Sequence, residues 1–468
     1  MISNKRRQEE IMKHFVPAAG RTPAIAEYEA LKFGVFVHFN MQQFVYTKDE
    51  FTQVNDPQVW NPTDLDVEQW FRRWKEAGVK YAVLTTKHTS DFCLWDTKTT
   101  ESNVMNSPVP VDIVKEFVTY ARKYEIKPCF YYCIWGGAYN PKEHADELML
   151  EQIEELLTKY GDIYLMWMDM ANWRPEGMTV QGIYDFIKNR QPDTLVHFNQ
   201  HIQDGTVLHY FPTDAVNGEE RIPPETGHIK LREVDKETYY LPFEYEICLQ
   251  KVEENVGKGY VQGTRWFTYS AREGMTPSHP APIEELYPFI HKAYQRGASN
   301  VILSTAPDFT GRVREEDAAA LTQIRSLIDR QAEDCVQAGS LYTTWKLCTT
   351  RRENTAASLR IRLKEDRKAR MLGCLFTAED KTDAELTLLT ADGRMLGTVI
   401  CKADAPSDML GFSYETLPAA VTLEAGREYI LVTERREHYA DITAKTTECA
   451  DIVSGIPLLS LVFEEEKG

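Results

Sequence analysis

The chain has 468 residues, of which 43% are hydrophobic and 26% charged, and its formal net charge is -18. This length exceeds the roughly 250–300 residues at which a single hydrophobic core stops growing, so we expect two domains. The acidic balance argues against nucleic acid and anionic membranes as partners, because both are bound through basic patches, and it suits a neutral ligand.

The N-terminal residues 1–10 are charged and lack the apolar core of a signal peptide, and no stretch reaches the roughly 20 apolar residues of a membrane span. Two locations stay open: the cytoplasm, or the periplasm or exterior after removal of a leader. The nine cysteines form no CxxC pair, which argues against zinc-ribbon and thioredoxin-like sites. We expect them to be structural and mostly reduced, like Cys129 and Cys133 in their apolar run.

Short apolar runs alternate with amphipathic helical stretches between residues 33 and 328, which predicts strand–helix units and a parallel sheet. No GxGxxG or Walker motif is present, so a nucleotide cofactor and an open doubly wound sheet are disfavoured. The pattern indicates an α/β fold of the (β/α)8-like (TIM) barrel type. The predicted strands are residues 33–39, 81–86, 128–134, 164–169, 194–199, a weaker one near 214–218, 240–249 and 300–306. The predicted helices are residues 67–77, 111–124, 143–160, 180–190, 282–296 and 315–330.

After residue 330, short alternating segments are separated by Asp and Gly turns, and Ala391-Asp392-Gly393 is typical of a hairpin. This texture predicts a C-terminal antiparallel β-sandwich. We therefore expect a barrel domain over residues 1–332 and a sandwich domain over residues 333–468. The sandwich gathers no His, Cys or paired acids, so we expect it to support the barrel, with carbohydrate binding as the alternative.

Parallel barrels carry their chemistry at the carboxyl ends of their strands. Residues 164–168 are apolar and aromatic, and the run ends in Asp169. A carboxylate there is either paired or faces a ligand, although Asp also starts turns and caps helices. Other chemically active side chains fall at the predicted strand ends: His38, Asn40, Lys87, His88, Trp135, Asn199, His201 and Glu219.

Two carboxylates on different strand ends are the minimum for glycoside hydrolysis, in which one attacks or activates water and the other protonates the leaving oxygen. Asp169 and Glu219 are the natural pair, while Glu220, Glu244 and Glu246 compete for the second role. A metal-dependent hydrolase would need clustered ligands, but His38-Phe39-Asn40 takes the place of an HxH motif and no HExxH occurs. We therefore expect neither a metal nor a cofactor. Indole rings near a barrel mouth stack on sugars when they are not core, which makes Trp95 and Trp135 candidate sugar-binding residues.

Four blocks of sequence carry a family resemblance. They are FGVFVHF at 33–39, AGVKYAVLTTKH at 77–88 with DFCLW at 91–95, ELLTKYG at 155–161 leading to WMD at 167–169, and GASNVIL at 297–303 with Pro307 and Gly311. In order and spacing they resemble the α-L-fucosidases of glycoside hydrolase family 29, over residues 30–330. The resemblance implies a barrel followed by a sandwich and a retaining, exo-acting α-L-fucosidase that forms a covalent glycosyl-enzyme.

The resemblance also implies residue roles. Asp169 matches the catalytic nucleophile, and His38, His88 and Glu50 match residues that bind sugar hydroxyls. GEERIP at 218–223 is similar to a family stretch that selects Glu219 over Glu220 as acid/base. The implied partner is a fucosylated or related oligosaccharide or glycoconjugate, and a homo-oligomer stays open.

Three positions depart from the family pattern: Thr89, Ser304, and Asn40, which stands where the family usually has glycine. Thr89 stands in place of the second histidine of the family's KHH motif, and Ser304 replaces an asparagine of the late block. A related α-L-sugar such as an α-L-galactoside is therefore an alternative substrate. A non-catalytic carbohydrate-binding barrel is the alternative from another functional class.

Overall fold

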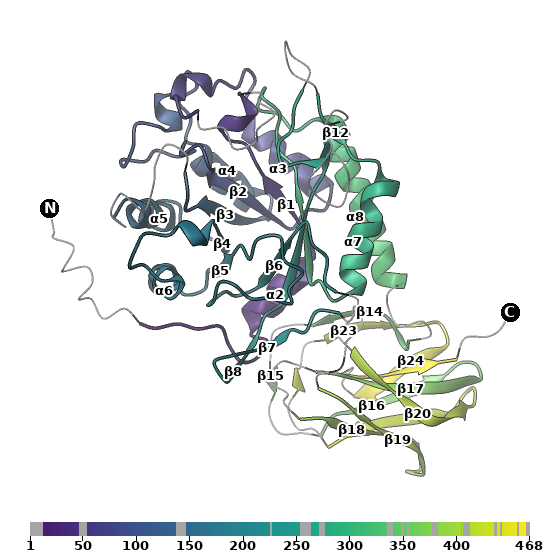
Figure 1. The fold of residues 1–468 in the computed structure, drawn as a ribbon. Helices are drawn as coiled ribbons and strands as arrows, with labels where there is room; N and C mark the ends of the chain where they lie inside the picture. Colours follow the sequence, from purple (N-terminus) through teal and green to yellow (C-terminus); the bar gives the residue numbers. More distant parts are fainter. Residues whose placement is uncertain are drawn as a thin grey trace. The chain divides into compact units, whose positions relative to one another are not determined.

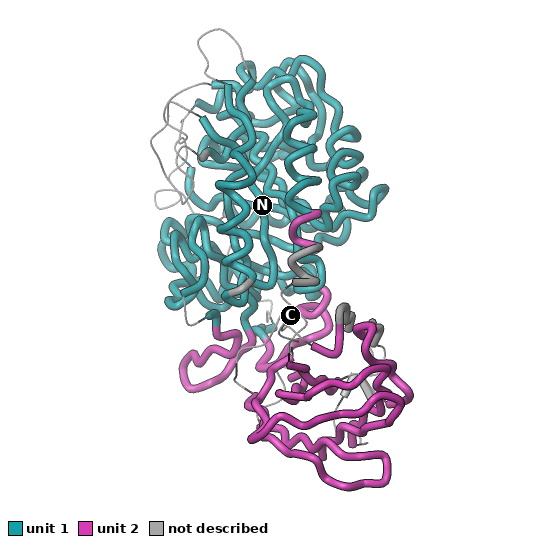
Figure 2. The backbone as a smooth tube through the Cα atoms, turned by 90° about the vertical axis from the view of Figure 1, so that its right-hand side faces the viewer, with its two compact units in different colours: residues 1–17, 28–228, 241–325 teal, residues 18–27, 229–240, 326–468 magenta. Residues whose placement is uncertain are grey.

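The computed structural model shows a helix-and-strand fold (Figure 1). It describes residues 13–45, 54–136, 147–224, 227–252, 264–270, 277–334, 340–347, 351–352, 356–376, 382–403, 405, 412–434, 438–439, 442–455 and 458–464. The chain divides into two compact units, one of residues 1–17, 28–228 and 241–325, the other of residues 18–27, 229–240 and 326–468 (Figure 2). Two short upstream segments thus cluster with the C-terminal residues, and a domain boundary between residues 332 and 333 stays a prediction.

The first unit contains an eight-stranded sheet whose pairings are all parallel, in the order β5-β4-β3-β2-β1-β13-β9-β6. Every residue of β1, β2 and β13 is buried, as expected for strands covered on both faces. The predicted barrel is confirmed, and each strand lies where the sequence predicted it. The strands are β1 (Phe33–Val37), β2 (Tyr81–Lys87), β3 (Lys127–Cys133), β4 (Leu165–Asp169), β5 (Leu195–Phe198), β6 (Val216–Glu219), β9 (Phe243–Cys248) and β13 (Asn300–Ser304).

The barrel has a seam between β5 and β6, which share no strand pairing among the described residues. One backbone bond, from the N–H of Asp214 to the carbonyl of Val196 at 2.8 Å, crosses the seam, and side chains add further bonds. The backbone N–H of Val196 donates to Asp214 Oδ2 at 2.8 Å, and that of Phe198 donates to Thr213 Oγ1 at 3.1 Å. These bonds satisfy backbone donors that would otherwise be orphaned in the interior.

The predicted helices are present, and their starts follow from capping side chains. Asp66 accepts from the N–H of Gln69, and Asp112 from that of Lys115, both at 2.9 Å. The helices are α2 (Pro23–Leu31), α3 (Val67–Glu76), α4 (Ile113–Lys123), α5 (Glu147–Lys159), α6 (Val180–Arg190), α7 (Ile283–Gln295) and α8 (Glu315–Asp334). Short 3-10 turns are η1 (Met41–Gln43), η2 (Pro57–Val59), η3 (Val104–Asn106) and η4 (Ala171–Trp173), and a small sheet is formed by β10 (Gln250–Lys251), β11 (Thr264–Arg265) and β12 (His279–Pro280).

The second unit contains two antiparallel sheets, β19-β18-β21-β16-β24 and β20-β17-β25, so the predicted antiparallel β-sandwich is confirmed. Their inward side chains, such as Leu359 of β16 and Leu372 of β17, share one buried core. The predicted hairpin is present, because Gly393 adopts φ 87° in the turn between β18 and β19. The strands are β7 (Leu231–Val234), β8 (Glu237–Tyr240), β14 (Tyr342–Leu347), β15 (Arg351–Arg352), β16 (Ser358–Leu363), β17 (Arg367–Leu375), β18 (Ala384–Thr390), β19 (Met395–Cys401), β20 (Phe412–Leu423), β21 (Glu428–Thr433), β22 (His438–Tyr439), β23 (Ile442–Thr446), β24 (Ala450–Gly455) and β25 (Leu459–Phe463).

Glu244 of β9 is a buried carboxylate inside the barrel. It accepts hydrogen bonds from the hydroxyls of Tyr28 at 2.5 Å and Tyr81 at 2.8 Å, and from the indole N–H of Trp167 at 3.1 Å. Burial opposes its ionisation, but nearby His197 and the hydroxyl donors hold the pKa of Glu244 below its usual value. Glu244 is thus part of the core's polar network.

Replacing Glu244 with alanine is expected to lower the free energy of unfolding by about 3–5 kcal/mol, because three buried donors lose their acceptor. Urea unfolding followed by tryptophan fluorescence measures this change. Glu151→Ala, at an exposed position of α5, is the control and should change stability by less than about 0.5 kcal/mol. Equal stability of the two variants would contradict the role given to Glu244.

Candidate active site

Asp169 ends β4 and accepts three hydrogen bonds. Its Oδ2 accepts from the hydroxyl of Tyr131 at 2.7 Å, and its Oδ1 accepts from Asn199 Nδ2 at 2.9 Å and from the backbone N–H of Met170 at 2.7 Å. Tyr131 comes from β3 and Asn199 follows β5, so three consecutive strand ends converge on this carboxylate. These donors fix the orientation of the half-buried carboxylate.

Asn199 joins Asp169 to Glu219. The same Nδ2 that donates to Asp169 Oδ1 also donates to Glu219 Oε2 at 2.8 Å. The two carboxylate oxygens therefore lie no more than 5.7 Å apart, which is the sum of the two bond distances. Asp169 and Glu219, which were predicted as a pair from the sequence, therefore lie close together at the carboxyl ends of β4 and β6.

Left-handed backbone conformations cluster at these strand ends. Asp91, Met170, His201 and Glu220 adopt φ values of 64°, 57°, 53° and 52°, a region that non-glycine residues rarely occupy. They follow β2, β4, β5 and β6 respectively. Each such residue stores roughly 1–3 kcal/mol of strain, and strain concentrates where side chains must be aimed at a ligand.

Two further carboxyl groups lie beside Glu219. Glu246 of β9 lies opposite Glu219 in the β6–β9 pairing and is buried. Burial, reinforced by Glu219, raises the pKa of Glu246 well above its usual value. Glu220 is buried beside Cys248, whose thiol donates to its Oε1 at 3.9 Å.

His38 and His88 form one wall of the site. Their ring centroids are 5.5 Å apart, and His88 stacks on Tyr131 at 5.6 Å. Burial lowers the pKa of His38 well below its usual value and that of His88 to about 4. Both imidazoles are therefore neutral near pH 7.

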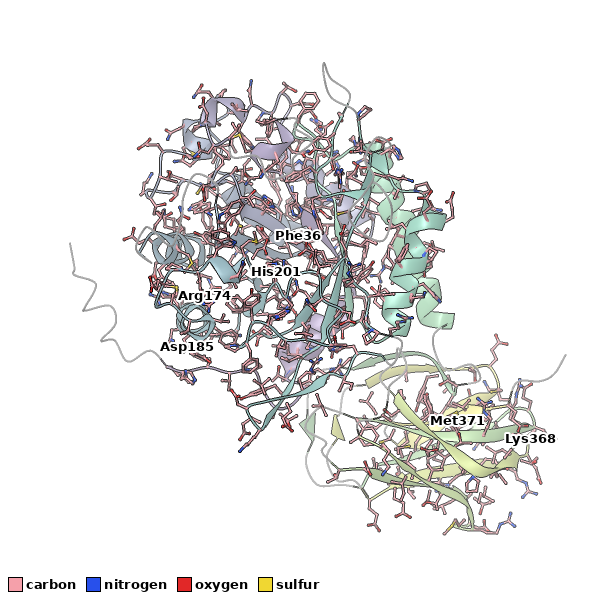
Figure 3. All side chains as sticks on the ribbon, in the orientation of Figure 1. Phe36, Arg174, Asp185, His201, Lys368 and Met371 are labelled. Carbon is pink, nitrogen blue, oxygen red and sulfur yellow. The ribbon has the colours of Figure 1, made fainter. Side chains whose placement is uncertain are left out.

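Phe36 of β1 lies beneath this wall. Its ring centroid is 4.6 Å from that of His38, 5.4 Å from that of Tyr131 and 5.2 Å from that of Trp167. Figure 3 labels Phe36 together with His201, which follows β5. The aromatic layer fills the barrel below the polar groups and keeps their positions fixed.

Lys87 at the end of β2 has a structural role. Its ammonium lies 2.8 Å from Asp91 Oδ1 and donates to the carbonyl of Cys133 at 2.8 Å. Burial opposes the charge, but Asp91 raises the pKa of Lys87 above its ordinary value. This pair ties the segment that carries His88 to the end of β3.

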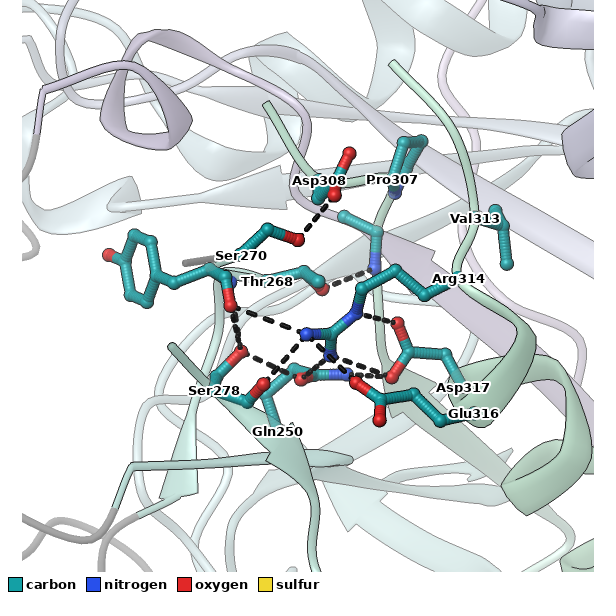
Figure 4. A network of polar contacts seen from close by, with 12 residues as sticks. Gln250, Thr268, Ser270, Ser278, Pro307, Asp308, Val313, Arg314, Glu316 and Asp317 are labelled. Carbon is teal, nitrogen blue, oxygen red and sulfur yellow. Dashed lines mark hydrogen bonds and ion pairs between the residues drawn. The ribbon is translucent and has the colours of Figure 1, made fainter. Parts of the chain in front are cut away.

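Arg314 anchors the segment after β9 (Figure 4). Its Nε donates to the buried Asp317 at 2.8 Å, and its Nη1 donates to the carbonyl of Tyr269 at 3.3 Å. The segment held in this way carries Trp266, whose ring centroid is 5.5 Å from that of His38. Arg314 therefore supports the wall of the site that faces the first strand.

Comparison with known proteins decides the family. The sequence model of the alpha-L-fucosidase family matches residues 40–333. The chain belongs to the alpha-L-fucosidase family. The resemblance to glycoside hydrolase family 29 noted from the sequence is thereby confirmed.

Individual relatives match over shorter stretches or at lower identity. Alpha-L-fucosidase 1 of Arabidopsis thaliana is 32% identical over 31% of this chain and 30% of its own length. A rice relative, from Oryza sativa subsp. japonica, is 33% identical over 34% of this chain and 31% of its own length. The alignments thus span about a third of these curated relatives. A solved structure from Bacteroides thetaiotaomicron covers 97% of this chain and 100% of its own, with a TM-score of 0.57 and 18% identity, which supports the shared fold.

The remaining predicted sugar-binding residues lie in different surroundings. Trp95 is fully buried and donates its indole N–H to Glu155 at 2.8 Å, which are contacts of a core residue. Trp135 is half-buried just after β3, with its ring centroid 5.8 Å from that of Trp173. Glu50 lies outside the described residues. Sugar binding by these three residues stays a prediction.

Sequence reasoning missed Tyr131 and Gln42, and it weighed Ser304 only as a departure from the family. Tyr131 lies inside an apolar run, and only its inward position beside β4 identifies it as a donor to Asp169. Gln42 lies in η1, and only its hydrogen-bonding contacts with His88 and Thr89 identify it as part of the site.

Neither a metal-ligand cluster nor a membrane-spanning helix occurs in the described residues. No three His, Cys, Asp or Glu side chains there lie in positions to hold a metal ion together. None of the helices in those ranges is long and apolar enough to cross a membrane.

Acidification is expected to destabilise the barrel through His88. The pKa of His88 falls from 6.5 to about 4 in the folded state, so between these values the unfolded chain binds more protons. The free energy of unfolding should therefore be largest above pH 6.5 and fall by up to about 3 kcal/mol as the pH drops towards 4. Urea unfolding across this range tests this dependence. His88→Gln should make the slope shallower, while His14→Gln, at a side chain that is 68% exposed, should leave it unchanged. An unaltered slope in His88→Gln would count against the buried neutral imidazole.

Proposed function

We propose that the protein is a retaining, exo-acting α-L-fucosidase that releases terminal α-L-fucosyl residues from oligosaccharides or glycoconjugates. The observation that carries the proposal is the Asn199 amide shared by Asp169 and Glu219. Retaining glycosidases hold their two carboxyl groups about 5–5.5 Å apart and inverting ones about 6.5–9.5 Å apart. The limit of 5.7 Å between Asp169 Oδ1 and Glu219 Oε2 supports the retaining arrangement. Family membership supplies the sugar class.

In the proposed reaction, the Asp169 carboxylate attacks the anomeric carbon while Glu219 gives its proton to the departing glycosidic oxygen. This forms the bond between Asp169 and the sugar and breaks the bond to the leaving group. Glu219 then takes a proton from water, whose oxygen displaces Asp169 with net retention. Tyr131, whose pKa is raised by burial and by Asp169, stays protonated and keeps donating to the nucleophile.

Glu219 suits the acid/base role better than its three rivals. Glu244 is fully engaged in the core, and Glu220 faces Cys248. Glu246 is buried behind the pair, next to Glu219 on the neighbouring strand. Glu219 shares the Asn199 donor with Asp169.

Substitution of either acid tests the assignment. With an activated aryl α-L-fucoside, Asp169→Asn should lower kcat by a factor on the order of 10⁴–10⁶, as for other covalent nucleophiles. Glu219→Gln should lower kcat by about 10²–10⁴ on a substrate with a poor leaving group and by less on an activated one, because the activated group departs without a proton. Asp185→Asn on α6, labelled in Figure 3, is the control and should retain activity.

NMR of the first-formed sugar should detect the α-anomer, because two displacements restore the starting configuration. A β-anomer would overturn the retaining mechanism. Full activity of Asp169→Asn would overturn the nucleophile. Inertness of the unaltered protein on every α-L-glycoside, with sugar binding retained, would favour the non-catalytic binding barrel instead.

Asn199→Ala is expected to lower kcat by about 10- to 100-fold, because it removes one hydrogen bond to each carboxylate and such bonds contribute about 1.5–3 kcal/mol each. Steady-state kinetics on the aryl α-L-fucoside measures the loss. Asn189→Ala on α6, whose amide bonds backbone carbonyls outside the site, is the matched control. A variant of Asn199 with unchanged kcat would mean that the shared amide plays no part in the reaction.

The identity of the sugar rests on His38, His88 and the segment around Thr89. Thr89 accepts a hydrogen bond from Gln42, so the position of the family's second histidine is occupied by a shorter, already engaged side chain. A comparison of aryl α-L-fucoside with α-L-galactoside tests the choice. A higher kcat/KM on the galactoside would replace the proposed substrate by the related sugar.

A further inference from the structure

The two histidines of the site each have a hydrogen-bonding neighbour on Nδ1, and the neighbours differ. His38 Nδ1 lies 2.9 Å from Ser304 Oγ. His88 Nδ1 lies 3.1 Å from Gln42 Nε2 and 3.1 Å from Thr89 Oγ1. All five side chains are at most 7% exposed. Ring nitrogens in such surroundings have their protons fixed by these neighbours.

Ser304 requires a proton on Nδ1 of His38. The Ser304 hydroxyl has a single proton, which it donates to the backbone carbonyl of Trp266 at 3.0 Å. The contact between Ser304 Oγ and His38 Nδ1 is therefore a bond in which the imidazole N–H donates and the hydroxyl accepts. In a neutral ring, Nε2 of His38 is then the unprotonated nitrogen and an acceptor.

Gln42 requires the opposite arrangement on His88. Its amide Nε2 donates to Thr89 Oγ1 at 3.0 Å and also faces His88 Nδ1. An amide nitrogen cannot accept, so Nδ1 of His88 is the acceptor and the proton lies on Nε2.

The orientation of the Gln42 amide follows from its surroundings. Its Oε1 is buried and has no hydrogen-bond partner among the described residues. Rotating the amide by half a turn would put two N–H donors at that place, where no described residue accepts them, and two unpaired buried donors cost more than one unpaired acceptor. In the favoured orientation the amide N–H donates to Thr89, and this arrangement sets His88.

We propose that Ser304 and Gln42, the latter hydrogen-bonded to Thr89, fix His38 and His88 in opposite neutral tautomers, so that the site presents one ring acceptor and one ring N–H donor to neighbouring hydroxyls of the ligand. The identification of that ligand as a sugar rests on the proposed function, whereas the tautomers follow from the contacts alone. Ser304, Gln42 and Thr89 are positioning residues, because they act through the two imidazoles.

Opposite tautomers restrict the ligand. A hydroxyl that faces Nε2 of His38 must donate, and one that faces Nε2 of His88 must accept. The site therefore selects a ligand with one hydroxyl that donates to His38 and another that accepts from His88. A ligand that lacks either hydroxyl leaves a buried ring nitrogen unpaired, which is how polar sites reject deoxy analogues. Thr89 and Ser304, two of the departures from the family pattern, each contact one of these histidines at Nδ1.

The experiment is long-range ¹H–¹⁵N NMR of the full chain labelled with ¹⁵N-histidine, near pH 7, with the two rings assigned from the His38→Gln and His88→Gln variants. The proposal expects the Nδ1–H form for His38 and the Nε2–H form for His88. The same tautomer in both rings, or either ring doubly protonated, overturns it. This readout needs no substrate, so an inactive protein with the expected spectra would refute the proposed function and leave the tautomers standing.

Variants extend the test. Gln42→Glu places an acceptor in front of His88 Nδ1, so the proton of His88 should move to Nδ1. The value of kcat/KM for the fucoside should then fall about tenfold, the equivalent of one lost hydrogen bond.

Ser304→Ala should release His38 from its Nδ1–H form. Thr305→Val is the matched control, because the Thr305 hydroxyl is buried next to Ser304 and has no partner among the described residues. Unchanged His88 signals in a folded Gln42→Glu protein overturn the proposal, and if that variant does not fold, the spectrum of the unaltered protein still decides.

Discussion

The arrangement of the site depends on one amide group, the side chain of Asn199. Its Nδ2 donates to Asp169 and Glu219, and its Oδ1 accepts from Asn217 Nδ2 at 3.2 Å and from the backbone N–H of His201 at 2.8 Å. The amide therefore cannot turn over without losing all four bonds. Asn217 lies on β6 and also accepts from the backbone N–H of Gln200 at 3.0 Å. Where the barrel lacks a backbone ladder between β5 and β6, side chains both close the sheet and position the two acids.

The carboxyl groups in the barrel differ in their burial and in the hydrogen-bond donors around them. Glu244, in the core, is held ionised by hydroxyl and indole donors. Two residues further along β9, Glu246 is buried close to other acids, and burial together with these acids raises its pKa well above its usual value. Asp169 and Glu219 lie at the open strand ends, where they are only half-buried. The number of ionised carboxylates that the barrel interior can hold thus depends on the hydrogen-bond donors that face them. At the strand ends these donors are Tyr131, Asn199 and a backbone N–H.

Sequence patterns predicted the elements better than the contacts between them. The eight strands were recognisable because burial on both faces makes them continuous apolar runs, and Asp169 was recognisable because a charge ends such a run. The weak sixth predicted strand, near residues 214–218, indicated the seam between β5 and β6. Tyr131 could not be told from its apolar neighbours, since its role depends on which way its hydroxyl points within the barrel. Gln42 and Ser304 act on residues 46 and 266 positions away, and such pairs leave no periodic signal in one sequence.

The donors around the two acids have a consequence for the proposed reaction. Lys87 is paired with Asp91, and both histidines are neutral, so none of these three groups brings a positive charge to the carboxylates. In the proposed reaction the negative charge lies on Asp169 before the first step and on Glu219 after it, when Asp169 has become a neutral ester. Asn199 donates to both positions. One fixed N–H group can therefore stabilise the charge before and after the first step, without the reorganisation that water would require.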